Sequence, residues 1–61
     1  MEKAKKLIFY IYMEGVKHYV CIFDDVEYKL ENSMQVLILY KNKEFIGVFS
    51  LSNLKMEVEE W

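Results

Sequence analysis

The chain has 61 residues, 54% of them hydrophobic, and a net charge of −2 from eight lysines and ten acidic residues, with no arginine. A chain this short forms one domain, and because it buries only about 60% of its unfolded surface, it usually needs a disulfide, a metal or a second subunit. Its single cysteine excludes an intrachain disulfide, and its near-neutral charge argues against a sequence-independent nucleic-acid-binding protein, which carries a positive excess.

The first predicted strand, residues 7–13, is hydrophobic on both faces. Side chains alternate between the faces of an extended backbone. One face therefore carries Leu7, Phe9, Ile11 and Met13, and the other carries Ile8, Tyr10 and Tyr12. A strand with one wet face would alternate apolar and polar residues. So short a chain has little material to cover two faces, and we expect a partner surface to cover one of them.

Glu14-Gly15 separates this strand from a second one, residues 17–23. It predicts a tight hairpin, because glycine tolerates the positive φ that such turns need. The second strand is rich in aromatic and β-branched residues, which favour strands. A two-residue loop fixes the register, and the expected cross-strand pairs are Tyr10 with Tyr19 and Phe9 with Val20.

Asp24-Asp25 comes next, and two interpretations compete. Paired aspartates bond their own backbone and bend or bulge a strand. Alternatively, they lie on an uninterrupted strand, which would keep Val20, Ile22, Val26, Tyr28 and Leu30 on one side. We favour the bend or bulge. In either case residues 26–31 alternate apolar and polar side chains, which is typical of a strand with one wet face.

The rest of the chain continues the β pattern. Residues 31–33 predict a turn and residues 34–40 a strand that is again apolar on both sides, followed by a polar loop at 41–44 and a strand at 45–49. Gly47 inside the last of these strands indicates a bulge or a close neighbouring backbone.

The C-terminal residues allow two interpretations. Leu54, Met56 and Val58 alternate with charged residues as in a strand, whereas Leu51, Leu54, Val58 and Trp61 have helical spacing. Glutamates late in a helix oppose its dipole, so we favour a strand. The predicted fold is a single all-β domain, residues 1–61. It is a small antiparallel meander sheet of four to five strands or a small barrel, with a short C-terminal helix as the alternative ending.

The two ends of the chain carry opposite charges. Lys3, Lys5 and Lys6 lie near the start, and Glu57, Glu59 and Glu60 lie near the end. If the first and last strands pair antiparallel, these sets meet within a subunit or between two. They would select the register more than they add stability, since an exposed ion pair contributes only about 0–1 kcal/mol. Alternatively, they are solvated tails that protect the sheet edges.

Few residues have chemistry near neutral pH. His18 and Cys21 are three positions apart, which in a regular strand places them on opposite faces, so we do not expect them to share a metal or to act as base and nucleophile. We interpret His18 as a surface or structural residue, Cys21 as a small buried hydrophobe and Asp24-Asp25 as a turn. No catalytic residue, cofactor site or metal site is predicted within a subunit. A metal shared by two subunits through His18 or Cys21 is the remaining alternative.

The aromatic residues give the best candidate site. Tyr10, Tyr12 and Tyr19 are expected on one face of the first hairpin, either in the core or in a protein interface, where aromatic residues are enriched. Aromatic side chains on a sheet also stack nucleic-acid bases, but such readers place basic residues among them, and only Lys17 and His18 are near. The predicted interface residues are Ile8, Tyr10, Tyr12, Tyr19 and the terminal Trp61.

These features predict a non-enzymatic protein–protein interaction module that forms a homodimer or a higher homo-oligomer. By analogy, it is an accessory protein of a phage or mobile element that binds a host protein and inhibits or regulates it. The alternatives are a small β-barrel that binds single-stranded nucleic acid on its aromatic face and a metal-handling protein joined through Cys21. Since no membrane-spanning or targeting segment is recognised, we expect the cytoplasm and a reduced thiol.

Overall fold

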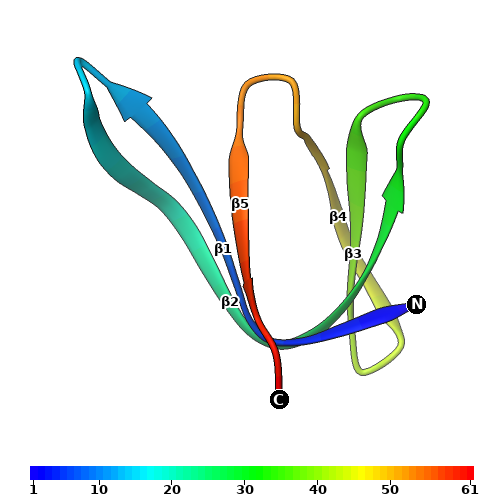
Figure 1. Ribbon diagram of the computed structural model, residues 1–61. Coiled ribbons are helices and arrows are strands. Elements are labelled where there is room, and N and C mark those ends of the chain that lie inside the picture. The colour runs from blue at the N-terminus through cyan, green and yellow to red at the C-terminus, as the bar shows by residue number, and fades with distance from the viewer.

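Five β-strands and their turns make up the whole chain in the computed structural model, which describes all 61 residues. The strands are β1 (Glu2–Met13), β2 (Val16–Glu31), β3 (Val36–Lys41), β4 (Glu44–Ser50) and β5 (Lys55–Glu59). They form one antiparallel sheet in the order β4-β3-β2-β1-β5, so β1 to β4 make a meander and β5 returns to the other side of β1 (Figure 1). The prediction of an all-β antiparallel fold is confirmed, and the C-terminal segment is a strand.

One tight turn joins β1 to β2, and another joins β3 to β4. Glu14 and Gly15 have φ values of 54° and 79°, and Asn42 and Lys43 have values of 52° and 65°. Two consecutive residues with positive φ form the turn whose twist matches that of an antiparallel strand pair. The hairpin predicted at Glu14-Gly15 is therefore confirmed, and the second loop narrows to two residues. β3 begins at Val36, later than predicted, because the residues before it form turns.

The first hairpin contains a bulge. Tyr10 pairs with Tyr19 as predicted, but Phe9 pairs with Cys21 and not with Val20. Val20 is therefore an extra residue in β2, inserted between two ladder pairs. The Phe9–Val20 pair expected from a regular ladder is wrong, because no residue type in this part of the chain marks the insertion.

A second bulge lies in β4. Leu39 pairs with Gly47 and Tyr40 pairs with Phe45, which leaves Ile46 as the extra residue. The bulge that Gly47 indicated is thus confirmed, and it falls on the residue just before the glycine. Its effect is to return Phe45 to the solvent-exposed face of the sheet.

β2 bends at Asp24-Asp25. Asp25 has a φ of 53°, in the left-handed region that aspartate tolerates. Before the bend Phe23 packs against the core, and after it Val26 and Tyr28 do, so the side-chain alternation switches at the two aspartates. This confirms the bend over the uninterrupted strand, in which Val26 would share a side with the exposed Ile22.

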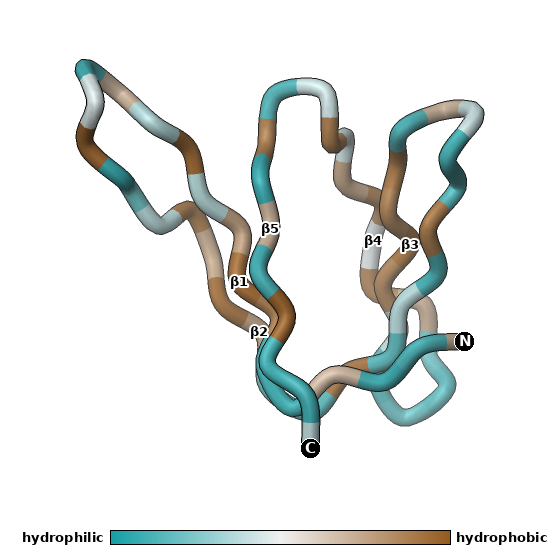
Figure 2. The backbone as a smooth tube through the Cα atoms, viewed as in Figure 1, coloured by the Kyte–Doolittle hydropathy of each residue, from teal (hydrophilic) through white to brown (hydrophobic).

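The bend folds one face of the sheet onto itself, and this inner face forms the core. The buried residues come from β1, β2 and β3, and they are Ala4, Leu7, Phe9, Val26, Tyr28, Leu37 and Leu39. Phe49 of β4 stacks on Phe9 with ring centroids 4.5 Å apart, and Phe23 meets both rings edge-on. The strands are hydrophobic where they converge, whereas the turns are hydrophilic (Figure 2). One sheet thus supplies both layers of the core.

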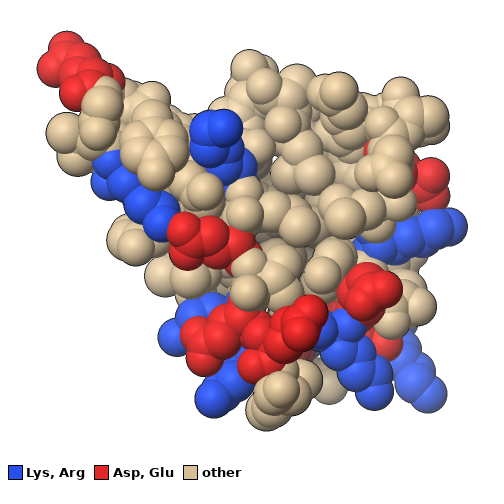
Figure 3. All heavy atoms as spheres, in the orientation of Figure 1, with Lys and Arg blue, Asp and Glu red and all other residues tan.

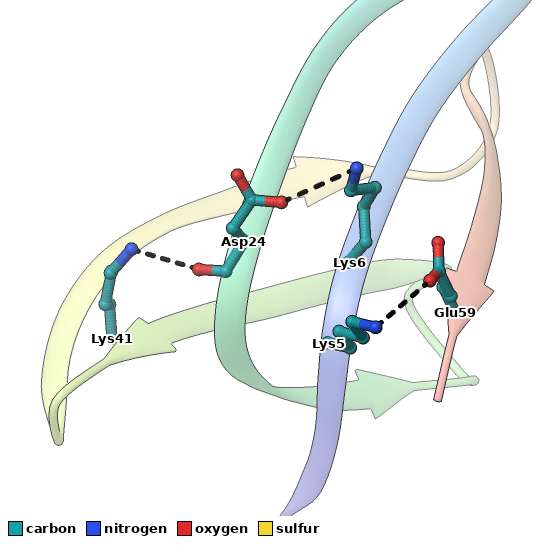
Figure 4. A network of polar contacts seen from close by, with 5 residues as sticks. All are labelled: Lys5, Lys6, Asp24, Lys41 and Glu59. Atoms are coloured by element: carbon teal, nitrogen blue, oxygen red, sulfur yellow. Dashed lines mark hydrogen bonds and ion pairs between the residues drawn. The ribbon is translucent and has the colours of Figure 1, made fainter. Parts of the chain in front are cut away.

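β5 brings the charged ends of the chain together. Its Glu59 lies opposite Lys6 of β1, and Lys5 Nζ lies 3.8 Å from Glu59 Oε1 (Figure 4). The predicted meeting of the N-terminal lysines with the C-terminal glutamates is confirmed, and it occurs within one subunit. β4 pairs only with β3, and β5 pairs only with β1, so the curved sheet stays open and does not close into a barrel.

Candidate protein-binding surface

The outer face of the first hairpin carries an uncovered apolar surface. Tyr10 pairs with Tyr19 and Ile8 pairs with Ile22, and Tyr12 follows Tyr10 on the same face. We name these five residues the outer hairpin patch. Tyr12, Tyr19 and Ile22 are 54%, 61% and 51% exposed, so no other element of the chain covers them. The prediction that the three tyrosines share one face is confirmed.

Lys17 connects the members of this patch. Its Nζ lies 4.2 Å from the ring centroid of Tyr10 and 5.3 Å from that of Tyr19, where the negative faces of the rings attract the ammonium. Nζ also donates a hydrogen bond to the Glu57 carboxylate of β5, and this bond raises the pKa of Lys17. The lysine therefore stays protonated and links side chains of three neighbouring strands.

The tyrosines also order one another. The rings of Tyr10 and Tyr12 lie 5.7 Å apart and almost perpendicular, an arrangement that aromatic pairs favour. Side chains held in this way lose little freedom when a partner binds, and that lowers the entropic cost of association. The patch thus combines tyrosine rings that contact one another with tyrosine hydroxyl groups that can form hydrogen bonds to a partner.

Trp61 does not belong to the patch. β5 runs from Lys55, opposite Tyr10, to Glu59, opposite Lys6, so the chain leaves the sheet far from the hairpin tip (Figure 1). The Trp61 side chain is 75% exposed, which means that it does not dock on its own sheet. The structure therefore brings the other four predicted interface residues together and places the tryptophan elsewhere.

His18 and Cys21 lie on the same face, contrary to the prediction. His18 pairs with Ile11, and Cys21 pairs with Phe9, which is two residues from Ile11 on β1. The bulge at Val20 causes this, because an inserted residue reverses the side-chain alternation. The chain has no group of three metal-ligating side chains placed to hold a metal ion.

Cys21 is a half-buried residue that packs against the core. Its burial raises the pKa of the thiol. The thiol is therefore protonated at neutral pH, and a protonated thiol is a weak nucleophile. Its environment is that of a small hydrophobic side chain.

The one hollow on the surface lies beside the bend of β2. It has a volume of about 240 Å³ and is lined by Lys3, Asp25, Val26, Glu27, Asn42 and Lys43. Asp24 does not line it, because its carboxylate faces Lys6 at 4.0 Å and its carbonyl oxygen accepts a hydrogen bond from Lys41 Nζ at 3.0 Å (Figure 4). Its lining is mainly polar and charged, and Val26 is the one hydrophobic residue in it.

A second apolar surface lies on the outer face of β3 and β4. Ile38 pairs with Val48 and Tyr40 pairs with Phe45, and the rings of Tyr40 and Phe45 lie 6.1 Å apart. Phe45 and Val48 are exposed. The charged side chains gather mainly in the part of the molecule near the two chain ends (Figure 3). Sequence reasoning did not single out this surface, although residues 36–39 showed two apolar faces.

The positions of Ile22 and Glu57 in the candidate site escaped prediction, and Lys17 was noted only as a basic residue near the tyrosines. Ile22 joins the tyrosines only because the bulge reverses the alternation of β2. Lys17 and Glu57 form a pair 40 positions apart in the sequence, and no local pattern reveals such a pair. The signal that was present is the opposite charge of the two residues, which becomes informative only once β5 is placed next to β1.

Comparisons with known proteins found no match. No protein-family model, no curated protein and no solved structure matches this chain. None of its elements is a helix with the length and apolar character to cross a membrane. The functional interpretation therefore rests on the chemistry of the surfaces.

Proposed function

We propose that this chain is a non-enzymatic protein–protein interaction module that associates with itself and docks another protein on the outer hairpin patch. The observation that carries the proposal is the uncovered patch itself, with Tyr12, Tyr19 and Ile22 each at least half exposed. Contiguous exposed apolar surface on a small protein marks interaction sites. In this proposal the protein acts in the cytoplasm, where it inhibits or regulates a host protein.

The chemistry of the patch suits a protein partner. Tyrosines offer large contact areas with few rotatable bonds, and their hydroxyl groups bond polar atoms of the partner. Ile8 and Ile22 add aliphatic surface between them. Lys17 and Glu57 add a pair of opposite charges among these side chains. Aromatic and aliphatic surface with a few polar groups is the composition of a protein-binding site.

Single-stranded nucleic acid suits the patch less well. The ammonium of Lys17 lies over Tyr10 and near Tyr19, so a stacking base would have to displace it. Glu57 and Glu59 of β5 are next to β1, and their carboxylates repel phosphate groups. We therefore rank a protein above a nucleic acid as the partner.

A matched pair of variants tests the proposal. Tyr12→Ser combined with Tyr19→Ser removes the exposed rings of the patch. Phe45→Ser is the control, because Phe45 on β4 is 62% exposed and Tyr19 is 61% exposed. The partner is captured from an extract of the native host, identified by mass spectrometry and purified. The double variant is expected to bind it at least about tenfold more weakly, since aromatic residues at the centre of an interface carry most of the binding energy.

The control variant is expected to bind the partner like the wild type, and circular dichroism checks that every variant is folded. Equal affinity of the double variant and the wild type would exclude the outer hairpin patch as the docking site. A mobility shift of single-stranded DNA or RNA at low salt that disappears as salt rises would favour nucleic-acid binding instead.

A further inference from the structure

A long part of β2 has a neighbouring strand on one side only. β3 pairs with residues 27–31 of β2, whereas the pairing of β1 with β2 begins at Val16. Residues 16–26 therefore have no neighbouring strand on that side, where the Asp24 carbonyl accepts a hydrogen bond from the Lys41 side chain. On its other side β1 is covered by β5 only up to Tyr10. The outer part of the hairpin, residues 11–20, is thus two strands wide, and we name it the hairpin arm (Figure 1).

The hairpin arm lacks the neighbours that a β element needs. A two-stranded hairpin is marginally stable in water, and three or more strands are required for independent stability. Five apolar side chains of the arm are each more than half exposed, and they are Tyr12, Met13, Val16, Tyr19 and Val20. They point to both faces, so no single surface of this subunit shelters them. A further strand on the free edge would extend both faces of the arm.

The contact of Lys41 with Asp24 shows which way the backbone of β2 points. Lys41 Nζ donates a hydrogen bond to the carbonyl oxygen of Asp24, so this carbonyl faces the β3 side and not β1. Since backbone groups of a strand alternate in direction, the amide and carbonyl groups of Ile22 face the same free edge. No strand of the chain reaches Ile22 on that side, and its groups are available to a partner strand.

We propose that a second copy of this chain occupies the free edge, with the two β2 strands paired antiparallel about a two-fold axis between Val20 and Cys21. The two sheets then join into one, in which β1 and β2 of one copy continue into β2 and β1 of the other. Each hairpin arm becomes part of a four-stranded element, which meets the requirement for stability. Because a two-fold interface uses the same edge of both copies, it closes without leaving a new open edge.

The bulge selects the register of this pairing. Opposite residues in an antiparallel pair lie on the same face. Since Val20 reverses the alternation, outer-face residues occur at odd positions before it and at even positions after it. One register keeps the faces matched along the edge. It pairs Lys17 with the second copy's Asp24, His18 with its Phe23, and Tyr19 with its Ile22.

The free edge is complementary to itself in charge. Lys17 near one end meets Asp24 near the other, and the Asp24 side chain is 70% exposed at 4.0 Å from Lys6. Between them, residues 19–23 contain no charged side chain. β5 differs, because Lys55, Glu57 and Glu59 place on its edge the charges that keep free edges from pairing. These contrasts favour a second copy on β2 over one on β5.

This inference rests on the self-association in the proposed function, and it assigns that self-association to the free edge of β2. The outer hairpin patch stays on the outer face in the dimer, so two patches lie next to each other and remain free to dock the partner. Dimer formation and partner docking are therefore separate measurements. Failure of one does not imply failure of the other.

The first test places a lysine on each of two edges. Val20 on β2 is 52% exposed and Val48 on β4 is 54% exposed, so Val20→Lys and Val48→Lys are matched changes. Analytical ultracentrifugation of the full chain up to high micromolar concentration measures the dimer. Val20→Lys is expected to raise the dimer dissociation constant by about tenfold or more, because a lysine on an edge opposes pairing and meets its symmetry mate. Val48→Lys is expected to leave it unchanged.

Circular dichroism establishes that both variants fold, which the exposure of both valines favours. A wild type that is monomeric at high micromolar concentration would overturn the inference together with the self-association in the proposed function. A dimer that Val48→Lys weakens as much as Val20→Lys would overturn the β2 pairing and leave self-association in place.

Cys21 gives a second readout without a substitution at the edge. In the proposed register the Cys21 residues of the two copies lie on the same face and diagonally across the axis, at a separation that a disulfide or a short bismaleimide spans. Mild oxidation at slightly alkaline pH is expected to yield a covalent dimer of the wild type and none of Cys21→Ser. A Val48→Cys, Cys21→Ser variant, with its cysteine on β4, is expected to give none.

The dimer is expected to persist when a metal chelator is added, since the backbone and side chains of β2 hold it together. If the chelator dissociates the dimer, a metal shared through Cys21 and His18, and not strand pairing, holds the two copies together. A dimer that is present in the ultracentrifuge but never captured through Cys21 would place self-association on another surface.

Discussion

From Leu7 to Tyr10, β1 lies between β5 and β2, whereas from Ile11 to Met13 the same strand has β2 alone beside it. Both segments are apolar on both faces. Phe9 is fully buried, but Met13, which lies on the same face, is 53% exposed. The difference between the two segments comes from the number of strands and side chains around them, and not from their own composition.

Residues 7–10 and 11–13 of β1 therefore have different surroundings. In the base of the hairpin, residues 7–10 of β1 have a strand on each side and a core on the inner face, so their apolar side chains stabilise the fold. In the hairpin arm the chain supplies neither, and the same kind of residue is left exposed. The apolar stretch of residues 7–13 thus has one part that stabilises the fold and one part that the chain does not cover.

Substitutions of Phe9 and Met13 are expected to show the largest contrast. Phe9→Ala removes a ring that stacks on Phe49 and meets Phe23, and it should lower the free energy of unfolding by about 3–5 kcal/mol. A domain of this size has about 3–9 kcal/mol in total, so the substitution removes a large share of the stability. Met13→Ala should cost less than about 0.5 kcal/mol. Urea denaturation at low protein concentration measures both.

Repeating the measurement at high protein concentration sharpens the comparison. Dimerisation adds to the apparent stability of the folded state, and the cost of Met13→Ala should grow if a second copy shelters the arm. Equal losses from the two substitutions at low concentration would show that the arm is packed as firmly as the base, and the distinction between the two segments would be lost.

The two tight turns give a smaller contrast. Lys43 has a φ of 65° in the turn between β3 and β4, a conformation that strains a residue with a Cβ atom. Lys43→Gly should raise the free energy of unfolding by about 0.5–1 kcal/mol. Glu14→Asn is the matching change in the turn of the hairpin arm, where Glu14 has a φ of 54°. Asparagine tolerates this left-handed conformation better than glutamate does. Its gain in global stability should be smaller, because the arm opens without unfolding the base.

Thermal unfolding followed by circular dichroism distinguishes the two turn variants, since about 1 kcal/mol shifts the midpoint of a domain this small by roughly 4–8 °C. The same gain from Glu14→Asn as from Lys43→Gly would mean that the arm and the base unfold as one unit. Hydrogen exchange of arm amides provides an independent check on that outcome.

Local patterns were sufficient to predict that the chain is built of strands and that it turns at Glu14-Gly15, although β1 begins at Glu2, before the apolar residues 7–13. These features depend on residues close in sequence: alternation, β-branched content and a glycine at positive φ. The bend at Asp24-Asp25 was also predictable in kind, because aspartate tolerates the left-handed backbone that Asp25 adopts. The pairing of the first and last strands was one of two interpretations of the charges at the chain ends, and the alternative was a pair of solvated tails.

The bulge at Val20 limited the prediction of the site. One inserted residue moved Ile22 to the side of Tyr19 and put His18 and Cys21 on a common face, and both results contradict a regular ladder. Valine has no intrinsic preference for a bulge, so the insertion reflects how β1 and β2 twist together around the core. The position of Trp61 was likewise not predictable, because it depends on the direction in which β5 leaves the sheet.

Cys21 lies where the base of the hairpin meets the hairpin arm. Of the changes in the free energy of unfolding considered, the one caused by its titration should be the smallest. Burial raises the pKa of the Cys21 thiol and of the Tyr28 hydroxyl, and the hydrogen bond to Glu57 raises that of Lys17. A group whose pKa is higher in the folded than in the unfolded protein stabilises the fold below its unfolded pKa, and this contribution is lost as the pH rises through the folded pKa. The free energy of unfolding should therefore decrease above about pH 8.5, where an ordinary thiol begins to ionise.

Urea denaturation at a series of alkaline pH values measures this decrease, and Cys21→Ser should remove only the thiol's part of it. Thiolate absorbance reports the titration directly, and its midpoint should lie above that of the unfolded chain. In the proposed dimer the edge of β2 beside Cys21 is covered, so raising the protein concentration should move the midpoint of the thiol titration further upward. A midpoint equal to that of the unfolded chain would mean that water reaches Cys21 freely, and the boundary between base and arm would then lie closer to Phe23.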